Sequence, residues 1–253
     1  MNPWTIYDEL IEPIPADVTV TAATAGLRWC QVVSSEGGLG ITYTLPERSR
    51  PTVYNEPSFV GARLRDIAAL AKSWNFAEAG IGMAAINAWW ATPARAEQNG
   101  FTSCAPHTWG DVFTPYAEAV AGKMVSVIGH FPFAPEALST AAELRVLERN
   151  TCPGDYPDSA CEYLLPDSDF VFISSSAFAN KTMPRLLNLA QHATTVILGP
   201  STPLSPALFE HGADIVTGFV SPEPATLFDS LGGLTLAGMF THGYRVEQRR
   251  GTR

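Results

Sequence analysis

Apolar and polar side chains alternate along residues 17–45, and this alternation predicts β-strands that bury one face. The apolar runs are short, and turn-forming residues separate them at Ala25-Gly26 and at Glu36-Gly37-Gly38. Such runs in close succession, at residues 18–21, 30–33 and 40–43, predict a small antiparallel meander.

Two helical patterns follow the meander. In the first, apolar residues recur at helical spacing and predict one buried face, made of Val60, Leu64, Ile67, Ala68 and Ala71. The second covers residues 78–90 and is apolar nearly all round, which indicates a buried helix. The first half of the chain is therefore expected to form a small α+β domain.

The second half alternates continuous apolar runs with helical segments. Runs of this kind predict parallel strands covered on both faces, as in a doubly wound, Rossmann-like sheet. The expected strands are residues 124–129, 145–148, 170–173, 195–198 and 214–216, and the expected helices are 111–122, 135–145 and 183–192. We therefore predict an α/β protein with two domains, residues 1–110 and residues 111–253.

Composition narrows the class of protein. The chain has 253 residues, of which 46% are hydrophobic and 16% charged, so it can bury a large core. Its formal net charge of −9 argues against nucleic acid or an anionic membrane as a partner, because both need clustered Lys and Arg. The basic residues near the C-terminus, Arg245, Arg249, Arg250 and Arg253, are expected to form a solvated tail. Neither a signal peptide nor an apolar span of roughly 18 residues is recognisable, so we expect a cytoplasmic protein.

The cysteines and histidines form no recognisable metal motif. Cys30, Cys104, Cys152 and Cys161 lack a Cys-x-x-Cys spacing and are expected to be reduced thiols. The histidines lack the His-x-x-x-His spacing that places two ligands on one helix face. No residue is therefore assigned to a metal from the sequence.

The residues with the most chemistry stand at the expected carboxyl ends of strands, where open α/β sheets bind their ligands. The loop after residues 195–198 combines prolines with hydroxyls and precedes a helix, whose N-terminus offers free N–H groups to anions. Ligand contacts are expected from Gly199, Pro200, Ser201, Thr202 and Pro203. We expect the two hydroxyls among them to bind an anion or a hydroxyl group.

The strand at residues 124–129 ends in Gly129-His130-Phe131, and Glu148 ends the next strand 19 residues after Gly129. An acidic residue at that distance binds a ribose hydroxyl in dinucleotide-binding sheets. The Gly-x-Gly-x-x-Gly pattern is incomplete, so a nucleoside or similar heterocycle is expected rather than a pyrophosphate. Glu148 has the alternative role of a solvated strand end. His130 fits either a general acid or base or a cap on a carbonyl.

Two further loops carry candidate residues. Asp155 and Tyr156 follow the second strand, where a carboxylate can act as a base or bind a cation, although Pro-Gly-Asp is also a common turn. Ser174 ends the third strand, and Asn180 and Thr182 begin the next helix. The alternative role of Asn180 is to cap the N-terminus of that helix. The absence of a Gly-x-Ser-x-Gly motif argues against a hydrolase triad.

Several runs in collinear order resemble the family named putative heavy-metal chelation, long known as a domain of unknown function. They are residues 128–133, 147–150, 154–157 and 198–206, together with 81–88, which resemble the end of its N-terminal partner domain. The resemblance implies an enolase N-terminal-like domain, then a Rossmann-like domain, with a site between the two. It also implies condensation or hydrolysis of pterin-, flavin- or siderophore-like molecules, or the handling of metal chelates. One departure is Lys181, which stands where the family has glycine.

The residues and the resemblance together predict an enzyme acting on a small, polar, anionic molecule between the domains, with His130 or Asp155 as acid or base. The residues expected to complete the pocket from the N-terminal side are Glu36, Gly37, Gly38 and Asn87. Candidate cofactors are an S-adenosylmethionine-like or nucleotide-like ligand and a divalent metal. The alternative is a non-catalytic binder or carrier of a metal chelate or of a nucleotide-like ligand. The Trp89-Trp90 pair, expected to be exposed, fits a homo-oligomer interface, and core packing explains it equally well.

Overall fold

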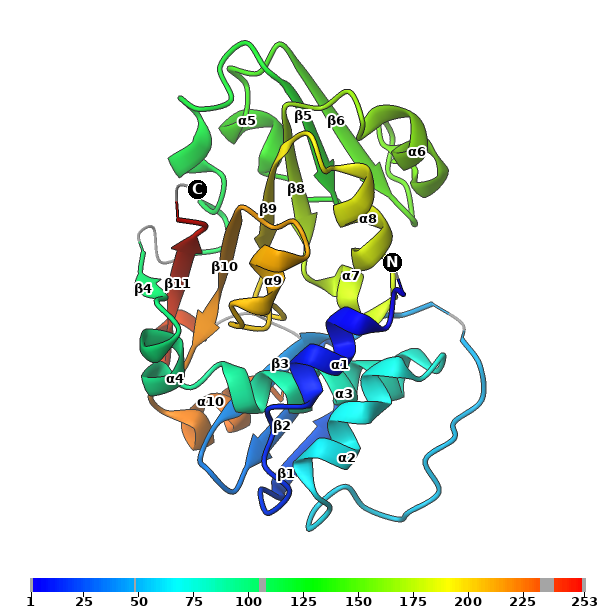
Figure 1. Ribbon diagram of the computed structural model, residues 1–253, viewed down its shortest axis with the longest axis vertical. Helices are drawn as coiled ribbons and strands as arrows, with labels where there is room; N and C mark the ends of the chain where they lie inside the picture. Colours follow the sequence, from blue (N-terminus) through cyan, green and yellow to red (C-terminus); the bar gives the residue numbers. More distant parts are fainter. Residues whose placement is uncertain (1, 48, 105–107, 233–238, 252–253) are drawn as a thin grey trace.

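Two β-sheets of unequal size organise the chain (Figure 1). We describe them in a computed structural model, in which residues 2–47, 49–104, 108–232 and 239–251 are described. The small sheet has three strands and the large one has eight. The expected fold class, an α+β unit followed by a doubly wound and mostly parallel sheet, is confirmed.

The small sheet is the antiparallel meander that the alternating pattern predicts. Its strands are β1 (Val20–Ala25), β2 (Trp29–Ser34) and β3 (Leu39–Tyr43), paired in that order. The long helix α3 (Phe76–Trp90) covers one face and is buried along almost its whole length, as its apolar sequence predicts. It lies close to β3 because Gly40 has no side chain: a Cβ there would stand 1.9 Å from the carbonyl oxygen of Ala84.

Shorter helices surround α3, and they differ from the sequence pattern in three places. They are α1 (Thr5–Ile11), α2 (Leu64–Ala68), a 3-10 helix (Ala69–Lys72) and α4 (Pro93–Gln98). Helix α1 was not expected from the sequence. Val60 precedes α2 and is exposed, so it is not part of the predicted apolar face. Trp90 is buried and donates to the carbonyl of Leu10, whereas Trp89 is half-buried beneath Arg95, so the two do not form an exposed pair.

The large sheet has the strand order β4-β11-β10-β9-β8-β5-β6-β7. The parallel strands are β5 (Met124–Ile128), β6 (Glu143–Glu148), β7 (Tyr156–Pro157), β8 (Phe170–Ser174), β9 (Thr194–Leu198) and β10 (Ile215–Val220). Two antiparallel strands, β11 (Tyr244–Arg249) and β4 (Thr102–Ser103), complete one edge. The chain thus adds β6 and β7 on one side of β5, and then crosses back to add β8, β9 and β10 on the other side.

Both faces of the large sheet are buried, and successive residues on a strand serve opposite layers. On β8, for example, Val171 and Ile173 pack into one apolar cluster and Phe172 into the other. The first layer contains α6 (Cys161–Leu164), α7 (Ser176–Ala179), α8 (Met183–Leu189) and α9 (Ala207–Glu210); the second contains α5 (Ala134–Ala137) and a 3-10 helix (Thr114–Tyr116). This two-sided burial explains why these strands are continuous apolar runs.

Two predicted helices are much shorter than expected. The segment 111–122 is mostly turns around one 3-10 helix, because Pro115 has no N–H for an α-helical hydrogen bond. The segment 135–145 is helical only in α5, because the backbone N–H of Ala142 donates to the carbonyl of Lys123 at 2.9 Å and β6 already begins at Glu143. A backbone N–H that bonds outside the helix cannot continue it.

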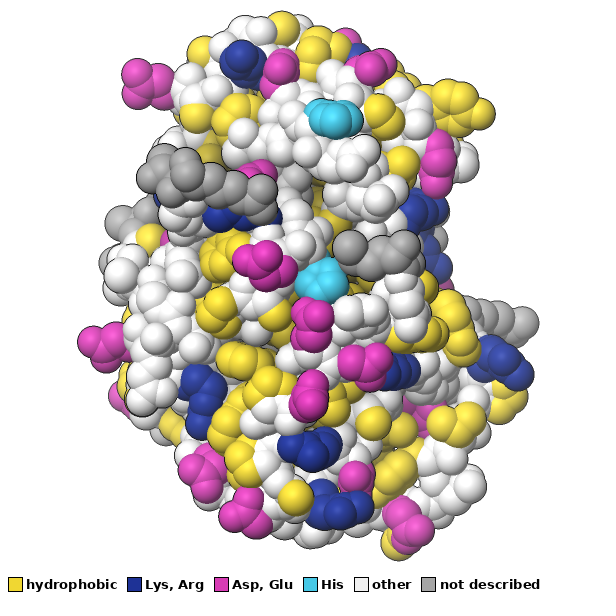
Figure 2. Space-filling view, in the orientation of Figure 1, with side chains coloured by type: hydrophobic (Ala, Val, Ile, Leu, Met, Phe, Trp, Pro, Cys, Tyr) yellow, Lys and Arg dark blue, Asp and Glu magenta, His cyan; other side chains and the backbone are white. Residues whose placement is uncertain are grey.

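The C-terminal basic residues are not a solvated tail. Strand β11 pairs with β10, and Arg245 is fully buried with its guanidinium carbon 5.7 Å from the ring centre of Trp109. Arg250 donates to the carbonyl of Phe209, and Arg253 lies outside the described residues. Figure 2 shows one face of the molecule, on which acidic and basic side chains are scattered and the basic ones form no continuous patch.

Contacts of several kinds fasten the small sheet and its helices to the large sheet. The hydroxyl of Tyr7 on α1 donates to the carbonyl of Phe178 at 2.7 Å. The backbone N–H of Tyr43 donates to the Ser201 hydroxyl at 3.0 Å. An apolar cluster joins residues of the small sheet to α10 (Pro224–Ser230), which follows β10. Among the described residues, no helix has both the length and the apolar character needed to cross a membrane.

Candidate functional site

A pocket of about 440 Å³ opens where the chain reverses direction in the large sheet. Strand β5 pairs with β6, the next strand in sequence, and on its other side with β8, after which the chain continues away through β9. Open α/β sheets bind their ligands outside the carboxyl ends of strands at this switch point. The volume lies within the range of roughly 300–1,000 Å³ that is usual for small-molecule sites.

The floor of the pocket is formed by three strand ends. Gly129 follows β5 and Gly199 follows β9, with φ angles of +111° and +127° that other residues rarely adopt. Ser174 and Ser175 end β8 between them. A Cβ at Gly199 would stand 2.5 Å from the Ser175 hydroxyl, so the strand ends are close together because glycine stands there.

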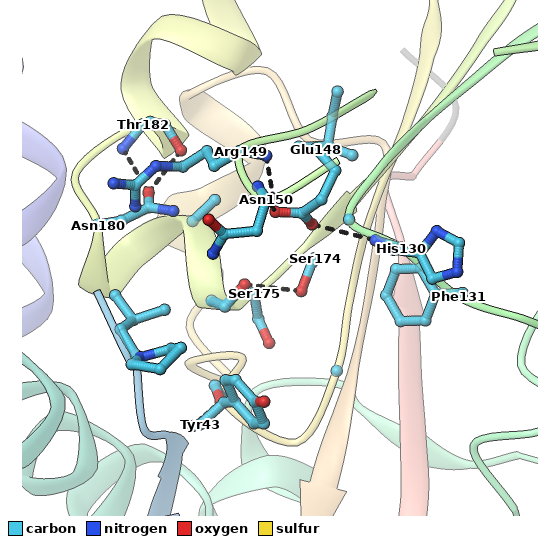
Figure 3. A pocket seen from close by; sticks show the side chains of 18 of the residues that line it. Tyr43, His130, Phe131, Glu148, Arg149, Asn150, Ser174, Ser175, Asn180 and Thr182 are labelled. Atoms are coloured by element: carbon cyan, nitrogen blue, oxygen red, sulfur yellow. Dashed lines mark hydrogen bonds between the residues drawn. The ribbon is translucent and has the colours of Figure 1, made fainter. Parts of the chain in front are cut away.

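The small sheet forms the opposite wall (Figure 3). Trp29 on β2 and Tyr43 on β3 are cross-strand neighbours whose rings meet edge to face at 5.9 Å. Among the described residues, the indole Nε1 of Trp29 and the Oε2 atom of Glu47 are buried without a hydrogen-bond partner. A buried polar group without a partner is costly, so these two atoms are points of local strain in the wall.

Glu148 holds the loops after β5 and β6 together (Figure 3). Its Oε2 accepts from the backbone N–H of His130 at 3.1 Å, and its Oε1 accepts from those of Arg149 and Asn150 at 2.7 and 3.3 Å. The Arg149 guanidinium lies 3.4 Å from Glu47, a half-exposed pair. Exposed pairs of this kind contribute little, so Arg149 can bind a ligand anion instead.

His130 and Asp155 are paired at the side of the pocket. The Asp155 carboxylate lies 3.0 Å from His130 Nδ1, and its side chain is only 4% exposed. The same carboxylate accepts from the backbone N–H of Cys152 at 2.8 Å. His130 lines the pocket, whereas Asp155 stands behind it. In Figure 3 the imidazole lies beside Phe131, away from Asn180 and Thr182.

Asn180 and Thr182 line the pocket on the side of Arg149. The Asn180 Oδ1 accepts from both the backbone N–H and the hydroxyl of Thr182, at 3.1 and 2.6 Å, so it fastens the turn between α7 and α8. Lys181 between them has a φ of +68°, in the left-handed region that side chains other than glycine rarely adopt.

Lys181 gives a prediction about pH and stability. Burial lowers the pKa of its ammonium group to about 8, against about 10.4 in an unfolded chain. Between these values the unfolded chain still holds a proton that the folded chain has released, so this group makes stability rise with pH. We expect Lys181→Met to stabilise the protein more at about pH 7 than at about pH 10. Urea unfolding at both pH values measures this, and an equal effect at both would contradict it.

The pocket brings together ten of the residues that the sequence suggested. They are Gly129, His130, Phe131, Glu148, Ser174, Asn180, Thr182, Gly199, Pro200 and Ser201. Eight others do not line it: Glu36, Gly37, Gly38, Asn87, Asp155, Tyr156, Thr202 and Pro203. The functional role of each of these residues stays a prediction.

The residues outside the pocket have structural contacts of their own. The Thr202 hydroxyl is buried and donates to the carbonyl of Gly199 at 2.8 Å. Gly38 contacts the end of α3, where a Cβ would stand 2.0 Å from the carbonyl oxygen of Ala88. Asn87 on α3 donates to the carbonyls of Ile41 and Ser201, at 3.0 and 2.9 Å. Tyr156 is exposed on β7 at the sheet edge.

Several pocket residues were not suggested by the sequence, most of them from the small sheet and the segment that follows it. They are Arg28, Trp29, Tyr43, Leu45, Pro46, Glu47, Trp109, Arg149 and Asn150. Arg149 and Asn150 directly follow Glu148, so their position as polar residues at a strand end was enough to predict them as pocket residues. The sequence carries no comparable signal for Trp29 and Tyr43, because their position in the pocket depends on how the two sheets pack together.

Fold and pocket together define a class: an α/β protein with a doubly wound sheet, a small antiparallel sheet docked against it, and a pocket between the two. Sequence comparison adds the family. The DUF364 family, described as putative heavy-metal chelation, matches residues 111–246, and DUF4213, with the same description, matches residues 7–90. The chain belongs to this putative heavy-metal chelation family.

Two solved structures are similar to the chain over almost its whole length. One is a protein of unknown function from the DUF364 family of Desulfitobacterium hafniense DCB-2, with 35% identity, a TM-score of 0.87, and 98% of each chain covered. The other is a DUF364 protein of unknown function from Pyrococcus horikoshii, with 25% identity and a TM-score of 0.77, covering 99% of this chain and 100% of that one. No curated protein matches the chain.

Proposed function

We propose that the pocket binds a small, flat, anionic molecule that itself chelates metal, of the pterin, flavin or siderophore type. The observation that carries the proposal is the composition of the two walls. Aromatic rings stand on the small sheet, and hydroxyl, amide and guanidinium groups stand on the strand ends opposite. Rings bind a planar molecule by stacking, and Arg149 supplies the charge that an anion needs.

The polar residues of the pocket support a ligand with mixed polarity. Ser174, Ser175 and Asn180 line it and carry both donors and acceptors. A heterocycle with both carbonyl and N–H groups matches such a lining. The family description, putative heavy-metal chelation, agrees with a ligand of this type.

Arg149→Met tests the proposal. The probes are a pterin, flavin mononucleotide and 2,3-dihydroxybenzoate, each alone and as its iron(III) complex, with binding followed by tryptophan fluorescence. We expect at least one probe to bind and the variant to weaken it by about tenfold or more, because hydrogen bonds to charged groups contribute about 1.5–3 kcal/mol. Arg63→Met is the control, since Arg63 pairs with Asp66 on the surface. The proposal fails if no probe binds or if Arg149→Met binds as tightly as the parent protein.

A second candidate function is catalysis on the bound molecule, and one observation favours it. The buried Asp155 carboxylate orients His130 through Nδ1, which leaves Nε2 as a general acid or base. This arrangement supports condensation or hydrolysis of the ligand. Mass spectrometry of each bound probe after incubation tests it, with S-adenosylmethionine and nucleotides added as co-substrates. An unchanged probe in every mixture indicates a binder or carrier instead.

A further inference from the structure

Three side chains of different chemistry meet beside the pocket. An imidazole nitrogen of His130, Cys152 Sγ and a carboxylate oxygen of Asp155 all lie within 4.8 Å of one another. His130 comes from the end of β5, and the other two come from the loop after β6. Of the three, only His130 also lines the pocket.

The loop holds Cys152 and Asp155 in a fixed relation. The backbone N–H of Asp155 donates to the carbonyl of Cys152 at 3.0 Å, and the Cys152 N–H donates back to the Asp155 carboxylate at 2.8 Å. Gly154 closes the turn with a φ of +96°. The carboxylate of this turn is also the group that contacts the imidazole, so the loop sets all three donors against the end of β5.

Cys152 differs from the other cysteines of the chain. Burial raises the pKa of the Cys30, Cys104 and Cys161 thiols, that of Cys161 to about 12, and so keeps them protonated. Cys152 is exposed. A metal binds the thiolate rather than the thiol, and an exposed side chain is free to rotate toward an ion.

We propose that His130, Cys152 and Asp155 form a binding site for a thiophilic divalent cation of the zinc type. One imidazole nitrogen, one thiolate and one carboxylate match the donors that Zn²⁺ takes, whereas Mg²⁺ and Ca²⁺ prefer oxygen donors alone. The His130 and Asp155 donors are 3.0–3.2 Å apart, close to the separation of about 3.3 Å between two ligands of a tetrahedral zinc. Three protein ligands leave a fourth position open.

The open coordination position connects the cation site to the pocket. Only this connection rests on the proposed function. His130 belongs to both, so an oxygen or nitrogen of a chelating molecule in the pocket can complete the coordination. An ion at His130 Nδ1 replaces its contact with Asp155. The His130–Asp155 pair and the cation site are therefore two states of the same side chains.

Calorimetric titration of the metal-free protein with Zn²⁺ alone tests the site. We expect one Zn²⁺ per chain, and with Co²⁺ the charge-transfer absorption of a thiolate–cobalt bond. Cys152→Ser should abolish that absorption and weaken Zn²⁺ binding by at least about tenfold, and His130→Asn should weaken it similarly. In Asp155→Asn the amide oxygen still accepts from the Cys152 N–H, so this variant removes the carboxylate charge and keeps the turn.

Cys104→Ser and His242→Asn are the matched controls, because neither residue belongs to the cluster, and both should bind Zn²⁺ like the parent protein. Arg149→Met should also keep its Zn²⁺ affinity while losing the organic probe, which separates this site from the proposed function. The proposal is overturned if the parent protein binds no Zn²⁺, or if Cys152→Ser keeps both the affinity and the cobalt absorption.

Discussion

Gly40→Ala is expected to unfold much of the protein or to prevent its accumulation. The added Cβ would stand 1.9 Å from the Ala84 carbonyl oxygen and 2.2 Å from the Ala88 nitrogen, and both are backbone atoms of α3. A helix backbone cannot rotate away as a side chain can, so the helix must shift from the sheet. We expect the free energy of unfolding to fall by about 3 kcal/mol or more, at the upper end of overpacking effects. Urea unfolding measures this fall.

The control for this substitution is Gly110→Ala. Its nearest atom to an added Cβ is the Thr108 hydroxyl oxygen at 3.8 Å, an ordinary contact. This variant should stay within about 0.5 kcal/mol of the parent protein, as surface substitutions usually do. If the two variants are equally stable, α3 and the small sheet are not held as closely as the structure has them.

Asn87→Asp is expected to have the second large effect, and one that depends on pH. The Asn87 amide is 1% exposed and donates to the carbonyls of Ile41 and Ser201. An aspartate there would set a buried negative charge against two carbonyl oxygens. Both burial and these oxygens raise its pKa above the unfolded value of about 3.9. We expect the variant to lose about 3 kcal/mol or more at pH 7, as when a buried charge has no partner.

The sign of the pH dependence follows from the raised pKa. Between about 3.9 and the folded pKa, the folded variant holds a proton that the unfolded one has released, so its stability falls as pH rises. Protonation also restores one donor toward a carbonyl. Unfolding at about pH 5 and about pH 8, compared with the parent protein, measures the difference. Asn99→Asp is the matched control, since Asn99 donates to one carbonyl and is half-buried. A loss independent of pH would contradict the argument.

Much of the fold could be predicted because strand patterns are local. The parallel strands are continuous apolar runs, and those of the small sheet alternate. Strand β11 was missed because only Tyr244 and Val246 in it are apolar, and its arginines resemble those of a solvated tail. Arg245 is buried by β10 and Trp109, which is a tertiary contact that no local pattern contains. Helix lengths were overestimated where a proline interrupts the helix or where the next strand begins early.

The candidate site could be predicted in part, for a topological reason. Gly129, Ser174 and Gly199 all end parallel strands, and parallel strands end at one edge. Trp29 and Tyr43 come from the other sheet, and the face that they present depends on docking. Cys152 lies nine residues before Cys161 and in no metal motif, so its position near His130 required the loop conformation.

The Ser201 contacts bear on the speed of ligand entry. The hydroxyl of this residue accepts from the backbone N–H of Tyr43 on β3, and its carbonyl accepts from the Asn87 amide on α3. Two hydrogen bonds therefore join the segment after β9 to the small sheet and its helix. Where these bonds persist, the two walls keep one separation. We therefore expect a molecule that fits the pocket to associate without waiting for the walls to close.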